Sequence, residues 1–447
     1  MMKNKLLYIQ TFGCQMNVHD SDQIASLLAD FGYKTTDNVN LADLILINTC
    51  SIREKAAQKV YSELGRIGLL KKKNPDLIIG VGGCLAQHLG SKFHKKIQHL
   101  DLVFGTHNIH LLPDMLAAVR KKREKITKID FHKSFNSIGI YAPPVNGAIS
   151  AFVTIMQGCN NFCSYCVVPY LRGPEMSRPP EDIIEEITKL ACSGIKEVTL
   201  LGQNVNSYGN TLEKHVKFAK LIRKIGKISG IERIRFTTSH PRDLSEDLIN
   251  CFAEEEKLCE HIHLPVQSGS NRLLRLMNRG YSIEDYLKKV DRLRHVCPGI
   301  SITSDIIVGF PGETEKDYQE TIDMMEKIRF DSTFSFKYSE RKGTAAEGLE
   351  GKIEESEKQR RLKNLQDLQN KHTMQKNMEL EGSLQKVLIE GKSKNSEHDL
   401  MGRTSSWRIV NFKGDQGIVG KMMDVKIIKS YLHSLRGKLI EEAGNVY

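Results

Sequence analysis

One stretch decides how the fold of this 447-residue chain is interpreted: Phe152-Val-Thr-Ile-Met-Gln-Gly-Cys159-Asn-Asn-Phe-Cys163-Ser-Tyr-Cys166. Its apolar and β-branched first half predicts a strand that begins at Phe152. The strand runs into a loop whose three cysteines have the spacing Cys-x3-Cys-x2-Cys. We therefore expect three thiols close together at the carboxyl end of one strand.

The central region around this stretch repeats a rhythm of strands and helices. Helical patterns occupy, for example, Asp182–Ala191, Lys217–Ile228 and Tyr286–His295. Strands are predicted to begin at Phe152, Val198, Arg235, Ile262, Ile302 and Thr333. Six β/α units predict a partial (β/α)6 TIM-like barrel, whose active site would form at the carboxyl ends of the strands, where the cysteine loop lies.

The first third of the chain shows the same alternation. Helix-like segments at Ser21–Phe31 and Arg53–Leu70 lie between short apolar runs, and His19-Asp20-Ser21 resembles a helix cap. The strand-like runs are Leu6–Gln10, Leu44–Asn48, Leu77–Val81 and Leu102–Gly105. This pattern predicts a doubly wound parallel sheet, an α/β fold.

The last part of the chain changes character. A charged helix from about Glu354 to Met378 leads into short β-type runs broken by turn residues, at Gln385–Ile389, Trp407–Phe412 and Val425–Ile428. They predict a small β-barrel of the kind that binds oligonucleotides. The predicted organisation is an N-terminal domain (1–130), a linker (131–146), a barrel domain (147–380) and a C-terminal domain (381–447).

Composition narrows the class of protein. No apolar run reaches the length of a membrane span, and the first residues contain too short an apolar stretch for a signal peptide. We therefore expect a cytoplasmic protein with no membrane partner.

The net charge of +11 suits a polyanionic partner such as nucleic acid, or serves solubility alone. Ten cysteines in a cytosolic chain indicate metal ligands, catalytic thiols or packing rather than disulfides.

Three thiolates suit iron–sulfur chemistry. Cys159, Cys163 and Cys166 can hold three corners of a four-iron cluster, which leaves one iron open to chelate a small molecule. A zinc knuckle is the alternative, but zinc prefers four ligands, and no fourth Cys or His follows Cys166 at a suitable spacing.

Other predicted strand ends carry polar or glycine-rich groups that could line the same site, since glycines let a backbone approach a nucleoside closely. An ordinary turn is the alternative for the glycines. These candidates are Gln203, Asn204, Ser239, Gln267, Gly309 and Gly312.

A second set of cysteines, Cys14, Cys50 and Cys84, closes three apolar strands of the first third. Because parallel strands end at one edge of a sheet, these thiols are expected to converge and bind a ligand. Buried structural cysteines are the alternative. The remaining Cys192, Cys251, Cys259 and Cys297 lie in helix-like segments and are interpreted as packing residues.

Basic and aromatic residues alternate in the C-terminal region, a composition typical of RNA contact. The alternative is that the aromatic residues fill the small barrel's own core. The predicted RNA-binding residues are Arg403, Trp407, Arg408 and Arg436. Arg172 and Arg178, beside the cysteine loop, are expected either to contact phosphates or to cap the loop.

The cysteine loop resembles that of the radical S-adenosylmethionine (radical SAM) superfamily, which has an aromatic residue before the third cysteine; Tyr165 holds that place. The resemblance implies that Cys159, Cys163 and Cys166 are catalytic and bind a [4Fe-4S] cluster. It also implies that Tyr165 lies beside the adenosine of S-adenosylmethionine, whose cleavage releases a 5′-deoxyadenosyl radical.

Over essentially the whole chain the sequence resembles the methylthiotransferase family within that superfamily. The resemblance rests on Thr11-Phe-Gly-Cys14-Gln-Met-Asn17, Asn48-Thr-Cys50-Ser-Ile-Arg-Glu54, Gly82-Gly-Cys84, Cys166-Val-Val-Pro-Tyr-Leu-Arg172-Gly, Leu201-Gly-Gln-Asn-Val-Asn206 and Ser434-Leu-Arg-Gly-Lys438. One departure is Lys342, where the family pattern leads us to expect proline.

The family resemblance implies a second [4Fe-4S] cluster on Cys14, Cys50 and Cys84 that carries or donates sulfur. The flanks of Cys14 and Cys50 look most like the branch that adds a methylthio group to C2 of N6-(dimethylallyl)adenosine next to the tRNA anticodon. Threonylcarbamoyl-adenosine in tRNA or a ribosomal protein are alternative substrates, and a non-catalytic, metal-stabilised RNA-binding module is a rival of another class. Expected partners are the tRNA anticodon stem-loop, a one-electron donor and a sulfur or cluster supply system, with the chain as a monomer and a C-terminal TRAM domain.

Overall fold

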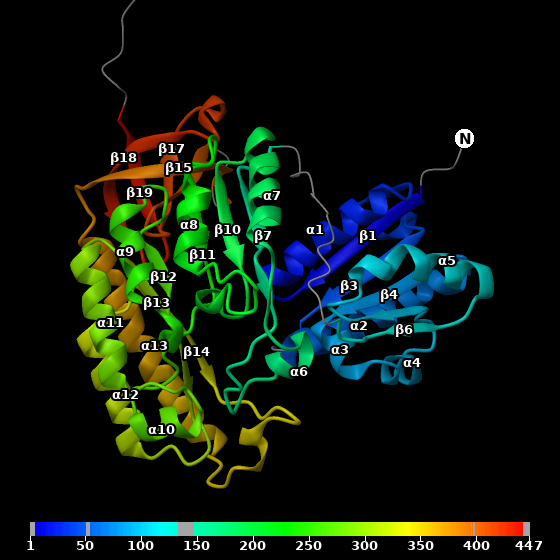
Figure 1. The fold of residues 1–447 in the computed structure, drawn as a ribbon, viewed down its shortest axis with the longest axis horizontal. Helices are drawn as coiled ribbons and strands as arrows, with labels where there is room; N and C mark the ends of the chain where they lie inside the picture. Colours follow the sequence, from blue (N-terminus) through cyan, green and yellow to red (C-terminus); the bar gives the residue numbers. More distant parts are fainter. Residues whose placement is uncertain (1–4, 51–53, 133–146, 395, 397, 441–447) are drawn as a thin grey trace, which may run out of the picture.

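The computed structural model describes residues 5–50, 54–132, 147–394, 396 and 398–440 (Figure 1). Most of the predicted linker, residues 133–146, therefore lies outside the described residues. None of the helices in the described part of the chain combines the length and apolar character needed to cross a bilayer.

The N-terminal region forms a six-stranded parallel sheet, as predicted. The sheet order is β2-β1-β3-β4-β5-β6, so the direction of winding reverses between β1 and β3. Ligands of doubly wound sheets bind at this switch point. The strands are β1 (Lys5–Phe12), β2 (Tyr33–Thr35), β3 (Leu44–Thr49), β4 (Ile78–Gly83), β5 (Leu102–Phe104) and β6 (Ile126–Lys128).

Helices cover both faces of this sheet. Residues alternate between two cores along β3: Leu44 and Leu46 pack with α1 and α5, and Ile45 and Ile47 pack with α2 and α4. Burial on both faces explains why β3 reads as a continuous apolar run. The helices are α1 (Gln15–Ala29), α2 (Glu54–Lys73), α3 (Cys84–Leu89), α4 (Lys92–Lys96) and α5 (Leu112–Lys122).

The prediction that the first helix starts at Ser21 was wrong. Helix α1 begins at Gln15, with Cys14 as its N-cap and the Asn17 side chain completing a capping box. Cysteine is not one of the usual cap residues, so the sequence carried no standard start signal. The polar residues His19, Asp20 and Ser21 are buried within the helix.

The central region forms the predicted partial barrel (Figure 1). Its strands form two parallel groups, β7-β10-β11 and β12-β13-β14, joined by a bridge between Ile234 and Leu258. Among the described strands, β14 pairs only with β13, so the barrel stays open on that side. The strands are β7 (Ser150–Thr154), β10 (Glu197–Leu201), β11 (Arg233–Phe236), β12 (His261–His263), β13 (Ser301–Val308) and β14 (Ser332–Lys337).

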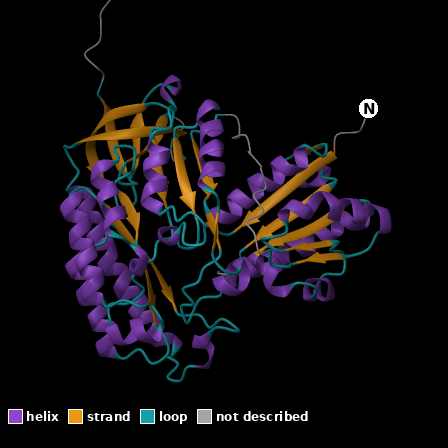
Figure 2. Ribbon diagram, in the orientation of Figure 1, coloured by secondary structure: helices purple, strands orange, loops and turns teal. Residues whose placement is uncertain are grey.

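Amphipathic helices surround the outside of these strands, as Figure 2 shows. Their apolar faces and the outward side chains of the strands make one large core. The helices are α7 (Pro180–Cys192), α8 (Phe218–Gly226), α9 (Glu246–Glu254), α11 (Ile283–Val296), α12 (Glu315–Ile328) and α13 (Glu355–Met378). Cys251, Cys259 and Cys297 are buried, whereas Cys192 is exposed at the end of α7 and is not a packing residue.

The C-terminal region is a closed five-stranded barrel in the order β15-β16-β17-β19-β18. Val387, Val410, Phe412 and Ile427 are fully buried in its core. Trp407, predicted to begin a strand, instead lies in the preceding turn with φ +70°. The strands are β15 (Leu384–Lys392), β16 (Asp399–Thr404), β17 (Ile409–Lys413), β18 (Met422–Ser430) and β19 (Leu435–Leu439).

Arginines from β11 attach the small barrel to the large one. The Arg235 guanidinium donates hydrogen bonds to the carbonyl oxygens of Thr404 (2.8 Å) and Ser405 (2.9 Å). It also lies 4.3 Å from the ring centroid of Trp407, which stacks on His261. From the other side, Arg408 donates to Asp331 Oδ1 at 2.6 Å. Trp407 and Arg408, predicted to bind RNA, are thus engaged between the two barrels.

We expect Arg408→Ala to lower the free energy of unfolding by about 1.5–3 kcal/mol, because the buried Asp331 carboxylate loses a charged hydrogen-bond partner. Trp407 is the one tryptophan of the chain, so its fluorescence in urea reports on this interface directly. Arg223→Ala, which removes surface ion pairs with Asp247 and Glu254, serves as the control and should cost at most about 1 kcal/mol. If Arg408→Ala and Arg223→Ala lowered the free energy of unfolding by the same small amount, a structural role for Arg408 would be contradicted.

Candidate active site between two sets of cysteines

The structure brings Cys14, Cys50 and Cys84 to one edge of the N-terminal sheet. They follow β1, β3 and β4, which are neighbours in the sheet. Cys14 is exposed and the other two are buried. A hydrogen bond with the Cys50 thiol lowers the pKa of Cys14 to about 5. The convergence predicted from the strand ends is therefore present.

Two asparagines hold these strand ends together. The Asn17 amide donates to Asn48 Oδ1 at 3.1 Å, and the Asn48 amide donates to Asn17 O at 2.8 Å. Asn48 also donates to Ser21 Oγ at 3.0 Å. Both asparagines are buried, so the start of α1 is fixed against the end of β3 beside the cysteines.

The loop cysteines lie at the end of the first barrel strand. Cys159 and Cys163 are buried and Cys166 is half-buried. Gly158, with φ +82°, opens the loop, and its N–H donates to Gln203 Oε1 at 2.5 Å. Burial raises the pKa of Cys159 to about 11 and that of Cys166 to about 12. Such thiols ionise only when a cation such as a metal balances their charge.

Arg279, which the sequence analysis missed, contacts this loop. Its guanidinium lies 3.3 Å from Cys163 Sγ and 3.4 Å from the Tyr165 hydroxyl, and donates to Pro265 O at 2.7 Å. Arg279 is 4% exposed, and burial raises the pKa of Tyr165 well above its ordinary value. No local motif marked Arg279, because it comes from the turn after α10 (Asn271–Leu276).

Arg172 joins the segment after the loop cysteines to the N-terminal set of cysteines. It ends helix α6 (Val168–Arg172), which Figure 1 shows beside α3 of the N-terminal domain. Its guanidinium donates to Asp20 Oδ2 at 3.0 Å and hydrogen-bonds to the Cys84 thiol. Burial opposes its charge, but Cys84 and Asp20 raise the pKa of Arg172 above its ordinary value.

Of the two roles left open for Arg172 and Arg178, contact with phosphates or capping of the loop, the structure favours contacts within the chain. Arg172 is 4% exposed and Arg178 6% exposed, and each is paired with a carboxylate of this chain, Asp20 and Glu186 respectively. Arg178 also donates to Thr154 O at 3.2 Å. Of the two alternatives, only contacts within the chain fit this burial.

The predicted strand-end residues divide into those that shape the backbone and those that hold buried polar atoms without a hydrogen-bond partner in the described part of the chain. Gln267 (φ +74°), Gly309 and Gly312 shape the backbone: Gly309 N donates to Glu313 Oε2 at 2.6 Å and Gly312 N to Gly351 O at 2.8 Å. Asn204 donates to Asp243 Oδ2 at 2.6 Å. Buried polar atoms without a hydrogen-bond partner among the described residues include Asn204 Oδ1, Ser239 Oγ and His240 Nε2. Such atoms are available to a polar ligand.

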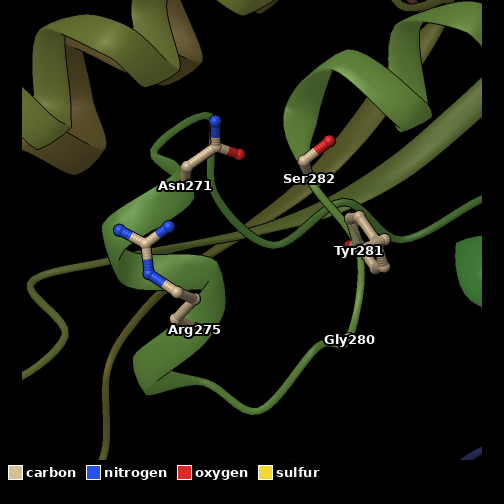
Figure 3. A pocket seen from close by; sticks show the side chains of 5 residues that line it. All are labelled: Asn271, Arg275, Gly280, Tyr281 and Ser282. Atoms are coloured by element: carbon tan, nitrogen blue, oxygen red, sulfur yellow. The ribbon is translucent and has the colours of Figure 1, made fainter.

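A surface pocket adjoins this site beside Arg279, whose Nε donates to the Tyr281 hydroxyl at 3.2 Å. Figure 3 shows that it is lined by Asn271, Arg275, Gly280, Tyr281 and Ser282. Asn271 is already bonded to Glu284 and to Ile283 N, and none of the lining residues is a cysteine.

The donor sets fit two iron–sulfur clusters. Each set offers three thiols, and each has a buried arginine that can offset thiolate charge: Arg172 for the first set and Arg279 for the second. Within the described residues, no group of His, Cys, Asp or Glu side chains could hold a single metal ion. In a cluster each thiolate binds a different iron, so the sulfurs need not meet at one point. The loop at the tip of β7 thus defines a radical SAM type of site.

Comparison with known proteins agrees with this class. Residues 153–325 match the radical SAM superfamily, residues 6–105 match the uncharacterized protein family UPF0004, and residues 379–440 match the TRAM domain. A curated protein of Syntrophus aciditrophicus is 60% identical over 441 residues, covering 99% of this chain and 96% of its own. One from Geobacter sulfurreducens is 51% identical over 446 residues, covering 100% of both chains.

Both relatives are named tRNA-2-methylthio-N(6)-dimethylallyladenosine synthase. This chain belongs to the same family, the radical SAM methylthiotransferases. Among solved structures, the radical S-adenosylmethionine methyltransferase TsrM of Kitasatospora setae, with cobalamin and a [4Fe-4S] cluster bound, is 14% identical with a TM-score of 0.57. The match covers 77% of each chain and supports the fold alone.

We expect Gly158→Ala to lower the free energy of unfolding by more than about 3 kcal/mol and to abolish iron binding by the loop. A methyl group there would overlap the Pro174 carbonyl oxygen at a positive φ. Gly194→Ala is the matched control, since Gly194 has φ +94° but nothing within 4 Å, and should cost about 1–2 kcal/mol. Urea unfolding and iron analysis make the comparison, and equal losses would contradict a steric constraint at Gly158.

Replacing Arg172 by glutamine should destabilise the protein by about 3–5 kcal/mol, because it leaves the Asp20 carboxylate buried without a cation. The double variant Arg172→Gln, Asp20→Asn should recover part of that loss. A double-mutant cycle from urea unfolding measures the coupling. Additive effects of the two substitutions would show that the pair is not coupled.

Proposed function

We propose that this protein adds a methylthio group to C2 of N6-(dimethylallyl)adenosine next to the anticodon of tRNA. The observation that carries the proposal is that the chain has two sets of three cysteines in two domains, and that Arg172, which follows the loop cysteines, reaches the N-terminal set at Asp20 and Cys84. A radical initiator alone would need only the loop at the tip of β7. The names and high identity of the full-length relatives support the substrate.

Each set of residues has a part in this chemistry. When bound, the cluster on Cys159, Cys163 and Cys166 with S-adenosylmethionine supplies a 5′-deoxyadenosyl radical, and the cluster on Cys14, Cys50 and Cys84 supplies sulfur. Tyr165 would lie beside the adenosine, with Gln203, Asn204, Ser239, Gln267, Gly309 and Gly312 around S-adenosylmethionine. Arg279 and Arg172 hold positive charge beside the two sets and help to exclude water.

For tRNA, we propose that the C-terminal barrel holds the anticodon stem-loop through its exposed face. Arg403 is paired with Glu390 and Arg436 with Asp399, so these predicted RNA contacts would require exchange of an internal carboxylate for phosphate. Tyr431, 48% exposed with the Lys429 ammonium 5.6 Å from its ring centroid, offers a stacking and cationic surface without that exchange.

The proposed division of labour follows the predicted domains: sulfur supply in 1–130, a link in 131–146, radical chemistry in 147–380 and RNA binding in 381–447. The reaction requires a one-electron donor and a system that renews the sulfur or the cluster, and we propose a cytoplasmic monomer. The turn at Lys342 closes without proline, since Thr344 N donates to Arg341 O at 3.2 Å.

The test is mass spectrometry of tRNA nucleosides from cells that lack this gene and carry single variants. Loss of the gene should leave dimethylallyladenosine without its methylthio form, and unchanged nucleosides would reject the proposal. Neither Cys163→Ala nor Cys50→Ala should restore the product. The exposed Cys192→Ala is the control and should restore it fully.

The purified variants separate the two sets of cysteines. Cys163→Ala should form no 5′-deoxyadenosine, because the radical-initiating cluster loses a ligand, whereas Cys50→Ala should still form it but insert no sulfur. Anaerobic iron analysis should give about eight irons per wild-type chain and about four when one cluster is lost. Identical behaviour of both variants would contradict a division of labour.

A further inference from the structure

Strand β14 exposes two phenylalanines on one face. Phe334 is 57% exposed and Phe336 is 44% exposed. Their strand neighbour Lys337 points to the opposite face, where its ammonium pairs with Glu355 and lies 3.1 Å from Gln359 Oε1, both on α13. The phenylalanine face is thus the one turned away from α13, which packs along β14 in Figure 1.

Neighbouring strands show that this face lines the interior of the partial barrel. Phe334 is opposite Asp305 in the register of β13 and β14, and its ring meets the His263 ring of β12 edge-on at 6.2 Å. His263 Nε2 lies 3.4 Å from Asp305 Oδ1. The alternate residues Ile302 and Ile306 face outward into the core under the helices.

The same face leads to the cysteine loop. Phe336 is opposite Ile307 in the strand register. Ile307 and Tyr165, the residue before Cys166, pack against one apolar cluster that contains Phe310 and Tyr338. Phe336 therefore lies toward the end of the barrel where the radical is generated.

We propose that Phe334 and Phe336 form a platform on which the target adenosine and its dimethylallyl group stack. The inference rests on the proposed function and deepens it by assigning substrate-binding residues. Single exposed apolar residues are common, but two rings on one interior face, at the open side of a barrel, are a contiguous apolar surface. Unpaired bases bind proteins by stacking on such rings.

The negative charge of Asp305 on this face disfavours threonylcarbamoyl-adenosine, the alternative tRNA substrate. Asp305, with a side chain 30% exposed, lies beside Phe334, and the nearby Lys337 is held on the other face by Glu355. On β11, Arg235 is engaged by Glu197 at 3.0 Å and by carbonyl oxygens of the C-terminal barrel. A threonylcarbamoyl group carries a carboxylate that Asp305 would repel, whereas the dimethylallyl group is neutral and apolar.

The test measures binding of anticodon stem-loop RNAs to the anaerobically reconstituted holoenzyme by fluorescence anisotropy. The target adenosine is unmodified, dimethylallylated or threonylcarbamoylated. Wild type should prefer the dimethylallyl RNA on the order of tenfold over the unmodified one, as expected when part of the apolar dimethylallyl group is buried against the rings. The double variant Phe334→Ala, Phe336→Ala should lose this preference, and Phe→Tyr at both positions should restore it.

Phe31→Ala is the matched control, because Phe31 is also 57% exposed but lies in the N-terminal domain; it should keep the wild-type preference. Retention of the preference by the double alanine variant overturns the platform, as does equal binding of the threonylcarbamoyl RNA by wild type. Product analysis with wild type and with the double alanine variant separates the two proposals. Methylthio product without dependence on the phenylalanines rejects the platform alone, and no product on any of the RNAs rejects the proposed function.

Discussion

The buried guanidinium of Arg172 holds α6, the helix that follows the loop cysteines, against the N-terminal domain. It extends from α6, six residues after Cys166, into the N-terminal domain, where Asp20 and the Cys84 thiol receive it. A charge with so little solvent contact must keep its partners, so the orientation of α6 against the N-terminal sheet is tightly constrained. The segment that follows the loop cysteines is therefore held beside Cys84 of the N-terminal set.

Parallel strands explain why each domain has its cysteines where it does. In both domains the strand carboxyl ends share an edge, and loops at that edge are free to carry ligands while the apolar strands build the core. The N-terminal set straddles the reversal of strand order between β1 and β3, and the loop set follows the first barrel strand. Under the proposed function, the loop set would hold the radical-generating cluster and the N-terminal set would hold the sulfur-supplying one.

Arginine and aromatic residues in the C-terminal barrel divide into two groups, one joined to the large barrel and one exposed, that composition does not separate. Trp407 and Arg408 bind the large barrel through Arg235, His261 and Asp331, whereas Tyr431 and Lys429 remain at the surface. The sequence does not distinguish the two groups. A guanidinium can pair with a carboxylate, an indole or a phosphate, and its partner is not visible in the sequence. Only the positions of the partners distinguish adhesion between domains from contact with RNA.

The sequence by itself determined the three-part α/β, barrel and β-barrel architecture, the strand ends that carry Cys14, Cys50 and Cys84, and the spacing of the loop cysteines. These features depend on short-range periodicity and on the common edge of parallel strands, both of which are visible locally. The tertiary structure alone decided that α1 begins at Cys14, that Arg172 and Arg279 accompany the cysteines, and that Phe334 faces the barrel interior. Asp20 and Arg172 are 152 residues apart, and Cys163 and Arg279 are 116 apart. Partners of buried charges are chosen by burial and distance in the folded chain, which no local pattern encodes.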